Sequence, residues 1–259
     1  MKISTNRDTS VPPMSKTFSV MTYNVHSCIG TDGRISPLRI AEVIAWYQPD
    51  VVALQELDAG LTRTELTDQA DLIAMTLEMS FHFHPSLQVE EGGYGNAILS
   101  RSRVRLVQAG ALPTQPLHPF LERRGALWVE VELEGSKIQI VTSHFGLDRK
   151  ERNLQADCIT GPEWLGNPEF HAPAVLCGDF NALPGSSAYR RITRRLRDAR
   201  RCLKGWRLKG TWPVQLPFMR IDHLFLTPDL KVRSITIPRT PLTRVASDHL
   251  PLIVTLELP

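Results

Sequence analysis

Ala174-Val175-Leu176-Cys177-Gly178-Asp179-Phe180-Asn181 consists of four apolar residues, a glycine, and then polar side chains at Asp179 and Asn181. An uninterrupted apolar run is typical of a strand buried on both faces in a parallel or mixed sheet. Because Asp179 and Asn181 are two positions apart, they project to the same side of an extended backbone. The stretch therefore predicts a buried strand with a carboxylate and a neutral amide together at its mouth.

A second polar group stands near the C-terminus, where Asp248 and His249 precede an apolar strand at 252–256. Polar residues also lie at the ends of other expected strands: Asn24, Glu56, His144, and Asp222 with His223. Alone, each is more often a turn residue or a hydrogen-bonded structural histidine. Their common place at strand ends, where open α/β sheets bind ligands, favours a single site.

Strands and helices alternate along the chain. Expected strands cover 18–25, 50–54, 174–178, 221–227, 231–237 and 251–257, with strand-rich segments at 94–107 and 126–144 and a hairpin near 134–136. Capping residues predict helices after Ser36-Pro37, Thr67-Asp68 and Ser186-Ser187, and another helix is expected over 148–165. This order predicts an α/β fold in which two mixed sheets pack face to face with helices outside.

The bulk composition indicates one large domain. The chain has 259 residues, of which 42% are hydrophobic, and a net charge of +3. We expect a disordered extension at 1–16 and one catalytic domain at 17–259. No run reaches the roughly 18 apolar residues of a membrane span, the N-terminus lacks a signal peptide's apolar segment, and the cysteines lack Cys-x-x-Cys spacing. These features predict a cytoplasmic protein, and we expect it to be a monomer.

The polar positions at the strand ends are rich in oxygen donors and include no cysteine. Carboxylate and amide oxygens suit Mg²⁺ or Mn²⁺, whereas zinc more often recruits cysteine or several histidines. Histidine beside carboxylates indicates general acid–base chemistry. A hard cation, a base and neutral donors together are what hydrolysis of a phosphate ester requires.

Seven short motifs occur in a fixed order: Thr22-Tyr23-Asn24-Val25, Leu54-Gln55-Glu56, Gly95-Asn96-Ala97-Ile98-Leu99-Ser100, Thr142-Ser143-His144-Phe145, Gly178-Asp179-Phe180-Asn181, Ile221-Asp222-His223 and Ser247-Asp248-His249-Leu250-Pro251. With them the chain closely resembles the endonuclease/exonuclease/phosphatase superfamily over residues 18–257. That superfamily includes abasic-site endonucleases, deoxyribonuclease I, neutral sphingomyelinases and inositol polyphosphate 5-phosphatases. The resemblance implies a four-layer α/β sandwich of two mixed β-sheets flanked by helices, and metal-dependent hydrolysis of phosphoesters.

The resemblance also implies a metal environment. Glu56 would be the principal ligand of Mg²⁺ or Mn²⁺, with Asn24 close by and Asp248 completing the environment. Whether one or two ions take part stays open.

Catalytic roles follow from the same resemblance. Asp179 would bind or deprotonate the attacking water, and Asn181 would orient the water and the phosphate. His249, oriented by Asp222, would contact the phosphate as general acid/base, and His144 would stabilise the developing charge. The expected reaction is in-line attack of water on phosphorus without a covalent enzyme intermediate.

Four further residues are candidates for substrate binding. His26 could be a metal ligand, a phosphate contact or a loop residue. Arg34 could face an anion from the glycine-rich loop 30–34, although a plain turn is favoured there. Tyr94 resembles a tyrosine near the site of abasic endonucleases and would equally fit a strand entry. Asn96 belongs to the third motif.

The substrate depends on less specific signals. Segment 190–209 carries ten basic side chains and one acidic one, Asp198. Ile192, Leu196, Ala199 and Leu203 have helix-like spacing, which predicts an amphipathic helix with a basic outer face. That face could be solvated, or it could contact nucleic acid or an anionic membrane surface. Trp206 and Trp212 could stack on bases, sit at a lipid interface or belong to the core.

We therefore expect a phosphodiesterase acting on nucleic acid or a phospholipid head group. The alternative is a catalytically silent module that uses the same cleft to hold a phosphorylated partner. Retention of every main reactive position argues against that alternative.

Overall fold

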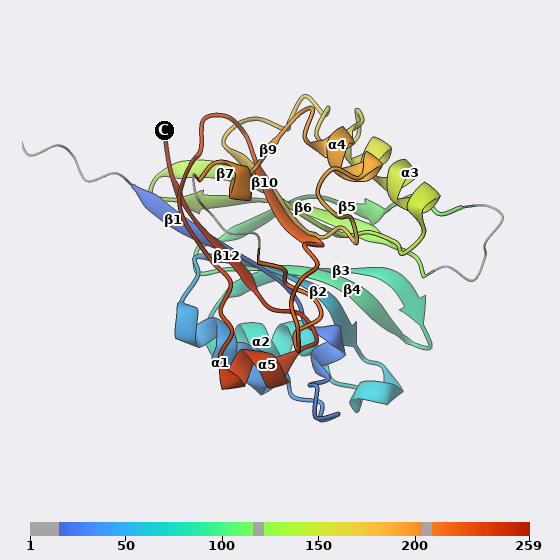
Figure 1. The fold of residues 1–259 in the computed structure, drawn as a ribbon. Helices are drawn as coiled ribbons and strands as arrows, with labels where there is room; N and C mark the ends of the chain where they lie inside the picture. Colours follow the sequence, from blue (N-terminus) through green and yellow to red (C-terminus); the bar gives the residue numbers. More distant parts are fainter. Residues whose placement is uncertain (1–15, 116–121, 204–208) are drawn as a thin grey trace, which may run out of the picture.

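The computed structural model describes residues 16–115, 122–203 and 209–259. Two six-stranded sheets pack face to face with helices on their outer faces, which confirms the predicted sandwich (Figure 1). The strand orders are β11-β12-β1-β2-β4-β3 and β5-β6-β7-β8-β10-β9. β1 and β2 are parallel, as are β7 and β8, while the other neighbours are antiparallel, so both sheets are mixed.

The first sheet carries the N-terminal half of the chain and its last two strands. Its strands are β1 (Thr17–Asn24), β2 (Val51–Ala59), β3 (Ser80–Val89), β4 (Gly92–Ser100), β11 (Lys231–Thr236) and β12 (Leu252–Glu257). Its outer helices are α1 (Pro37–Tyr47), α2 (Gln69–Leu77) and α5 (Pro241–Ala246) (Figure 1). Ser36 and Asp68 cap α1 and α2 as predicted, each accepting a backbone N–H three residues on.

The second sheet carries the middle of the chain. Its strands are β5 (Val104–Ala111), β6 (Gly125–Leu133), β7 (Ser136–His144), β8 (Ala174–Asp179), β9 (Arg197–Asp198) and β10 (Asp222–Leu226). The helices α3 (Arg149–Thr160) and α4 (Ser187–Ile192) cover its outer face (Figure 1). Short 3₁₀ helices form at η1 (His26–Cys28), η2 (Thr62–Thr64) and η3 (Ala199–Arg201).

The packing of strand β8 explains why its residues 174–177 are all apolar. Val175 and Cys177 point into the core between the two sheets, whereas Leu176 points into the core beneath the helices. Both faces of β8 are therefore covered, and all six of its residues are buried.

Some expected elements differ from the observed ones. β3 and α5 were not predicted, and the helix expected over 148–165 ends at Thr160. The amphipathic helix expected from Ile192 to Leu203 is wrong, since α4 ends at Ile192 and β9 and η3 follow. Within the described ranges no helix has the length and hydrophobicity needed to cross a membrane. Except for its last residue, the N-terminal extension expected over 1–16 lies outside the described residues, and so does Trp206.

Candidate active site

The polar strand ends of both sheets meet at one edge of the sandwich. Parallel pairing places Asn24 opposite Gln55 in the first sheet and His144 opposite Asp179 in the second. Antiparallel pairing places Asp222 opposite Asp179. His249 reaches the same place from the segment before β12. The structure thus brings Asn24, Glu56, His144, Asp179, Asp222 and His249 close together. His223, which was expected in the same group, lies apart from it, against Tyr189 and Phe225.

Unusual backbone conformations determine where the side chains of Glu56 and Asp179 point. Glu56 has φ 61° and lies in a bulge of β2, where the pairing with β4 skips between Leu54 and Leu57. A bulge redirects a side chain that regular alternation would point elsewhere. Gly178 has φ 146°, and a Cβ there would lie 1.9 Å from the Ser143 carbonyl oxygen. Only glycine fits this position, which brings β8 close to β7 just before Asp179.

Asn24 joins the acids of the two sheets. Its Nδ2 donates to Glu56 Oε1 at 2.7 Å and to Asp179 Oδ2 at 3.1 Å. Its Oδ1 accepts the backbone N–H of His26 at 3.1 Å, which fixes the amide orientation. In this arrangement Asn24 faces the carboxylates with its nitrogen and holds their oxygens close together.

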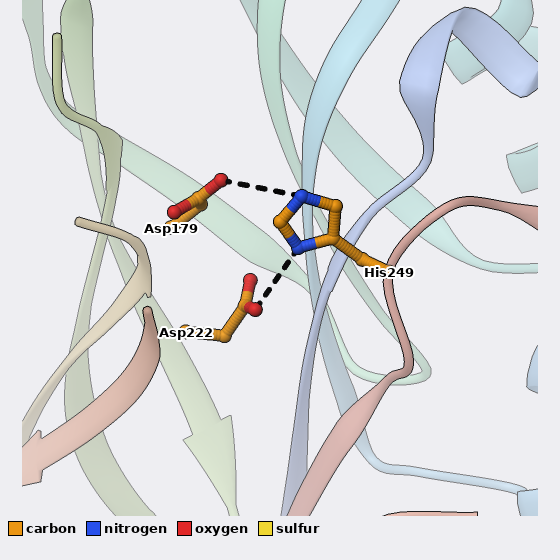
Figure 2. A group of neighbouring side chains, drawn as sticks. All are labelled: Asp179, Asp222 and His249. Atoms are coloured by element: carbon orange, nitrogen blue, oxygen red, sulfur yellow. Dashed lines mark hydrogen bonds and ion pairs between the residues drawn. The ribbon is translucent and has the colours of Figure 1, made fainter. Parts of the chain in front are cut away.

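His249 lies between two buried aspartates (Figure 2). Its Nδ1 is 3.0 Å from Asp222 Oδ2, and its Nε2 is 3.7 Å from Asp179 Oδ2. Burial alone would lower the pKa of His249, but the charge and hydrogen bond of Asp222 outweigh it and raise the pKa to about 10. Burial and the Asp222 charge raise the pKa of Asp179. The pair therefore combines a protonated imidazole with a carboxylate of increased basicity.

His144 and Asn181 line the opposite side of Asp179. His144 Nε2 lies 3.5 Å from Asp179 Oδ2 and 3.8 Å from Glu56 Oε1. Asn181 donates its backbone N–H to Asp179 Oδ1 at 2.9 Å and its Nδ2 to the Phe145 carbonyl at 3.0 Å. Burial and the nearby Arg124 lower the pKa of His144 well below its usual range, so this ring is neutral.

Glu56 is an acid of the cluster whose surroundings favour its ionised form. Burial opposes ionisation, but hydrogen bonds from His26 and Asn24 outweigh it and hold the pKa of Glu56 below its usual range. His26 Nδ1 lies 3.5 Å from Glu56 Oε2 and 3.9 Å from Asp248 Oδ1, so His26 stands between these acids. Trp212 Nε1 donates to Asp248 Oδ2 at 3.1 Å, and the Trp212 ring lies beside His249. Asp248 and Trp212 thus form the rim of the site.

The remaining candidates have different surroundings. Tyr94 is buried, lies beneath the Arg63 guanidinium at 5.4 Å, and lines a cavity of about 290 Å³ that also touches Glu56 and His26. Asn96 is buried, and its Nδ2 donates to the Gly125 carbonyl at 3.1 Å across the two sheets. Arg34 is exposed and makes no ion pair or side-chain hydrogen bond with site residues in the described part of the chain.

Sequence reasoning missed two arginines at the site. Arg124 is buried beside His144, and Arg63 lines the cavity that touches Glu56. Arg63 is fixed by Asp58, which is fully buried and accepts from Arg63 Nε at 2.8 Å and Nη2 at 2.7 Å. Neither arginine belongs to one of the seven motifs, so the motifs provide no reason to place either of them at the site.

Two groups of side chains could hold a metal ion. Asp179, Asp222 and His249 offer ligand atoms within 4.8 Å of one another. Glu56 and Asp179 offer carboxylate oxygens that share one amide donor, Asn24. The second group provides oxygen ligands only, which suits a hard cation. In the first group, the imidazole is already engaged by Asp222.

The described arginines of the basic segment 190–209 have different partners. Arg191 pairs with Asp157 at 2.6 Å, and Arg197 donates to the carbonyls of Thr227, Pro228 and Leu230. Arg190, by contrast, is exposed and lines a cavity of about 310 Å³ together with Arg149 and Arg152. This arginine-lined cavity lies between the first turns of α3 and the start of α4.

Comparisons with known proteins agree with this geometry. A family model described as "Endonuclease/Exonuclease/phosphatase family" matches residues 21–249. "Uncharacterized protein YbhP" of Escherichia coli (strain K12) is 26% identical over 93% of this chain and 96% of its own length.

Solved structures share the fold. An endonuclease/exonuclease/phosphatase from Beutenbergia cavernae superposes with a TM-score of 0.77 at 24% identity, covering 94% of this chain and 72% of that one. The Bacteroides thetaiotaomicron mannosyl-6-phosphatase Bt3783 has a TM-score of 0.73 at 21% identity, covering 92% and 99%. The human Nocturnin catalytic domain has a TM-score of 0.71 at 23% identity, covering 94% and 95%.

Proposed function

Because the chain belongs to the endonuclease/exonuclease/phosphatase family, we propose that it is a divalent-metal-dependent phosphodiesterase that cleaves its substrate by in-line attack of water. The observation that carries the proposal is the position of Asp179. Its Oδ2 accepts a hydrogen bond from Asn24 Nδ2, which also donates to Glu56. The same oxygen faces His249 Nε2. One carboxylate thus links a set of oxygen ligands to a protonated imidazole.

Glu56 would hold Mg²⁺ or Mn²⁺, with Asp179 adjacent and Asp248 at the rim. The donor set fits a hard cation, because Glu56 ionises readily and the oxygens of Glu56 and Asp179 are held together by Asn24. Bound there, the ion would polarise a phosphoryl oxygen and offset its negative charge.

Asp179 would take the proton of the attacking water. Burial and the neighbouring Asp222 charge increase the basicity of its carboxylate, as a general base at neutral pH requires. Asn181 fixes the direction of this carboxylate through its backbone N–H. His249, held by Asp222, would donate a hydrogen bond or proton to the phosphate.

The surroundings favour an anionic, extended substrate. The cavity lined by Arg149, Arg152 and Arg190 would take a neighbouring phosphate of a nucleic acid, because guanidinium groups bind phosphate in forked pairs. On the other side, the cavity beside Glu56 and Tyr94 would take the non-reacting part of the substrate. We therefore favour a nucleic acid over a phospholipid head group.

Metal-dependent turnover tests the proposal. The wild type should hydrolyse bis-p-nitrophenyl phosphate with Mg²⁺ or Mn²⁺, and EDTA should abolish the activity. Glu56→Gln should lose metal affinity in calorimetry and lose turnover by at least about 10²-fold. Glu42→Gln, on the exposed face of α1, is the matched control and should behave as wild type.

A substrate panel then separates the candidate chemistries. Oligonucleotides, phospholipids, inositol phosphates and sugar phosphates should be compared under one metal condition. Preference for a phosphomonoester would overturn the phosphodiesterase assignment. Metal-dependent binding of phosphorylated ligands without turnover on any substrate would support the silent module instead.

A further inference from the structure

Arg63 lines the cavity that touches Glu56, and a buried carboxylate holds one edge of its guanidinium. Asp58 is fully buried and accepts from Arg63 Nε at 2.8 Å and from Nη2 at 2.7 Å. Ser27 and Thr64 donate their hydroxyls to the same carboxylate at 3.2 Å and 3.1 Å. Because the pair has two contact points and its carboxylate is anchored, it fixes the plane of the guanidinium as well as its position.

The pairing of β2 with β4 places a tyrosine ring against that plane. Asp58 lies opposite Tyr94 in this antiparallel pair, so the two side chains project from the same face of the sheet. The chain then turns through η2 and brings Arg63 back over the ring, with Cζ 5.4 Å from the ring centroid. Tyr94 therefore covers one face of the guanidinium in a cation–π contact.

The other face of the Arg63 guanidinium is left for a ligand. The side chain is 57% exposed, although Asp58 covers one edge and Tyr94 one face. Within the described ranges, its Nη1 has no hydrogen-bond partner. Leu87 and Val89, two positions apart on β3, add an apolar wall to the same cavity. The cavity therefore combines a flat guanidinium surface with apolar side chains.

The charged side chains that line this cavity are each paired within the protein. The pairs are Arg63 with Asp58, Glu122 with Arg124, and His26 with Glu56. A second phosphate would therefore find no cation here without a carboxylate beside it, whereas an uncharged ring needs no counter-charge. The cavity thus favours an uncharged, planar part of the substrate over another phosphate.

We propose that this cavity is a nucleobase subsite, in which Arg63, held by Asp58 and Tyr94, stacks on the base next to the phosphate that is cleaved. Guanidinium planes and aromatic rings are the surfaces on which proteins stack unpaired bases. The cavity of about 290 Å³ is close to the ~300 Å³ lower end of ligand pockets, which suits one ring system rather than a length of chain. The place of the base in the reaction rests on the proposed phosphodiesterase function, while base binding by itself does not.

Binding of free nucleosides tests the subsite without metal or turnover. Saturation-transfer NMR titrations in EDTA compare adenosine and thymidine with ribose and with glycerol phosphate, and the nucleosides should bind more tightly than either. Arg63→Lys keeps a cation beside Asp58 but has no planar group, so it should weaken nucleoside binding by at least about fivefold. Absence of nucleoside binding, or equal binding by the wild type and Arg63→Lys, would overturn the proposal.

Two diesters with the same leaving group test the subsite in the reaction. The p-nitrophenyl phosphodiester of thymidine carries a base, and methyl p-nitrophenyl phosphate carries none. In the wild type kcat/KM should be at least about tenfold higher for the thymidine ester, mainly through a lower KM. Arg63→Lys should reduce this preference to less than about threefold and change turnover of the methyl ester little. A preference kept in Arg63→Lys but lost in Arg63→Gln would show that charge, not stacking, acts there, and would overturn the proposal.

A matched control and a stability measurement complete the test. Arg105 is 58% exposed and pairs with the carboxylate of Glu130 at 3.2 Å on the edge strand β5, so Arg105→Lys should keep the wild-type preference. Thermal unfolding of each variant identifies any loss caused by misfolding. Nucleoside binding by a protein that hydrolyses no diester would refute the proposed function and leave the subsite standing. Turnover of both diesters without a preference for thymidine would refute the subsite alone.

Discussion

Asp222 Oδ2 lies 3.0 Å from His249 Nδ1, and both side chains are almost completely buried. A buried carboxylate at this distance stabilises the imidazolium and fixes the direction of the ring. Because Asp222 comes from β10 and His249 from the segment before β12, the contact joins the two sheets at the candidate site. With Nδ1 held by Asp222, the ring of His249 turns its Nε2 toward Asp179 (Figure 2).

Asp222→Asn should lower kcat by at least about 10²-fold, because an amide neither stabilises the charged imidazole nor enforces its orientation. KM and the unfolding midpoint should change little, since the substitution is isosteric. Steady-state kinetics measure kcat and KM, and urea unfolding measures the midpoint. Asp71→Asn, on the outer helix α2, serves as control. Wild-type kcat in Asp222→Asn would remove the acid–base role of His249.

Gly178→Ala should destabilise the fold by at least about 3 kcal/mol, because φ 146° is unfavourable for alanine and the added Cβ would meet the Ser143 carbonyl at 1.9 Å. Urea unfolding gives the free energy. Gly110→Ala is the control, since its new Cβ would meet only Trp164, at an ordinary 3.8 Å. Equal stability of the two variants would contradict the requirement for glycine between β7 and β8.

The motifs predicted most of the site because most of them stand at one end of a strand. A parallel pair brings two such ends together, which accounts for Asn24 with Glu56 and for His144 with Asp179. The sequence could not predict the bulge that aims Glu56, because its cause is the pairing of β2 with β4. Nor could it predict Arg124 beside His144, since that contact joins side chains twenty residues apart, one just before β6 and the other at the end of β7.

The amphipathic helix expected over Ile192–Leu203 failed for a tertiary reason. Ile192 and Leu196 pack beneath the helices, on the outer side of the second sheet, while Ala199 and Leu203 pack into the core between the sheets. Apolar residues that serve cores on opposite sides of a sheet cannot form one face of a helix. Their helix-like spacing was therefore a coincidence.

β3 was missed because it is an edge strand with a weak pattern. All but two of its ten positions are half-buried, and Pro85 interrupts it at a bulge opposite β4. Proline argues against a central strand but is tolerated at a sheet edge. The sequence shows the proline, while only the fold shows that the strand lies at the edge.

His223 should make stability depend on pH. It is fully buried, its Nε2 lies 2.8 Å from the Ala182 carbonyl, and burial lowers its pKa to about 4. In the unfolded chain the ring binds a proton near pH 6.5. The folded state therefore loses stability as pH falls from about 6.5 to 4, by about 3 kcal/mol in total from this group.

Urea unfolding of wild type and His223→Gln between pH 4 and 8 measures this dependence. Glutamine can keep the hydrogen bond to Ala182 but does not titrate, so its unfolding free energy should fall less steeply below pH 6.5. Parallel curves for the two proteins would show that His223 is not buried as a neutral ring.

The arginine-lined cavity gives the last prediction, since Arg149 and Arg190 form no ion pair with an acidic side chain in the described part of the chain. Arg149→Gln and Arg190→Gln together should weaken binding of a single-stranded oligonucleotide, measured in EDTA so that it is not cleaved. The slope of log affinity against log salt should fall by about 0.7 for each phosphate that is no longer neutralised. Arg191→Gln is the matched control on the same helix, because Asp157 already occupies that side chain at 2.6 Å. An unchanged salt slope in the double variant, or an equally large decrease in the control, would leave Arg149 and Arg190 as solvated surface and return the lipid head group to consideration.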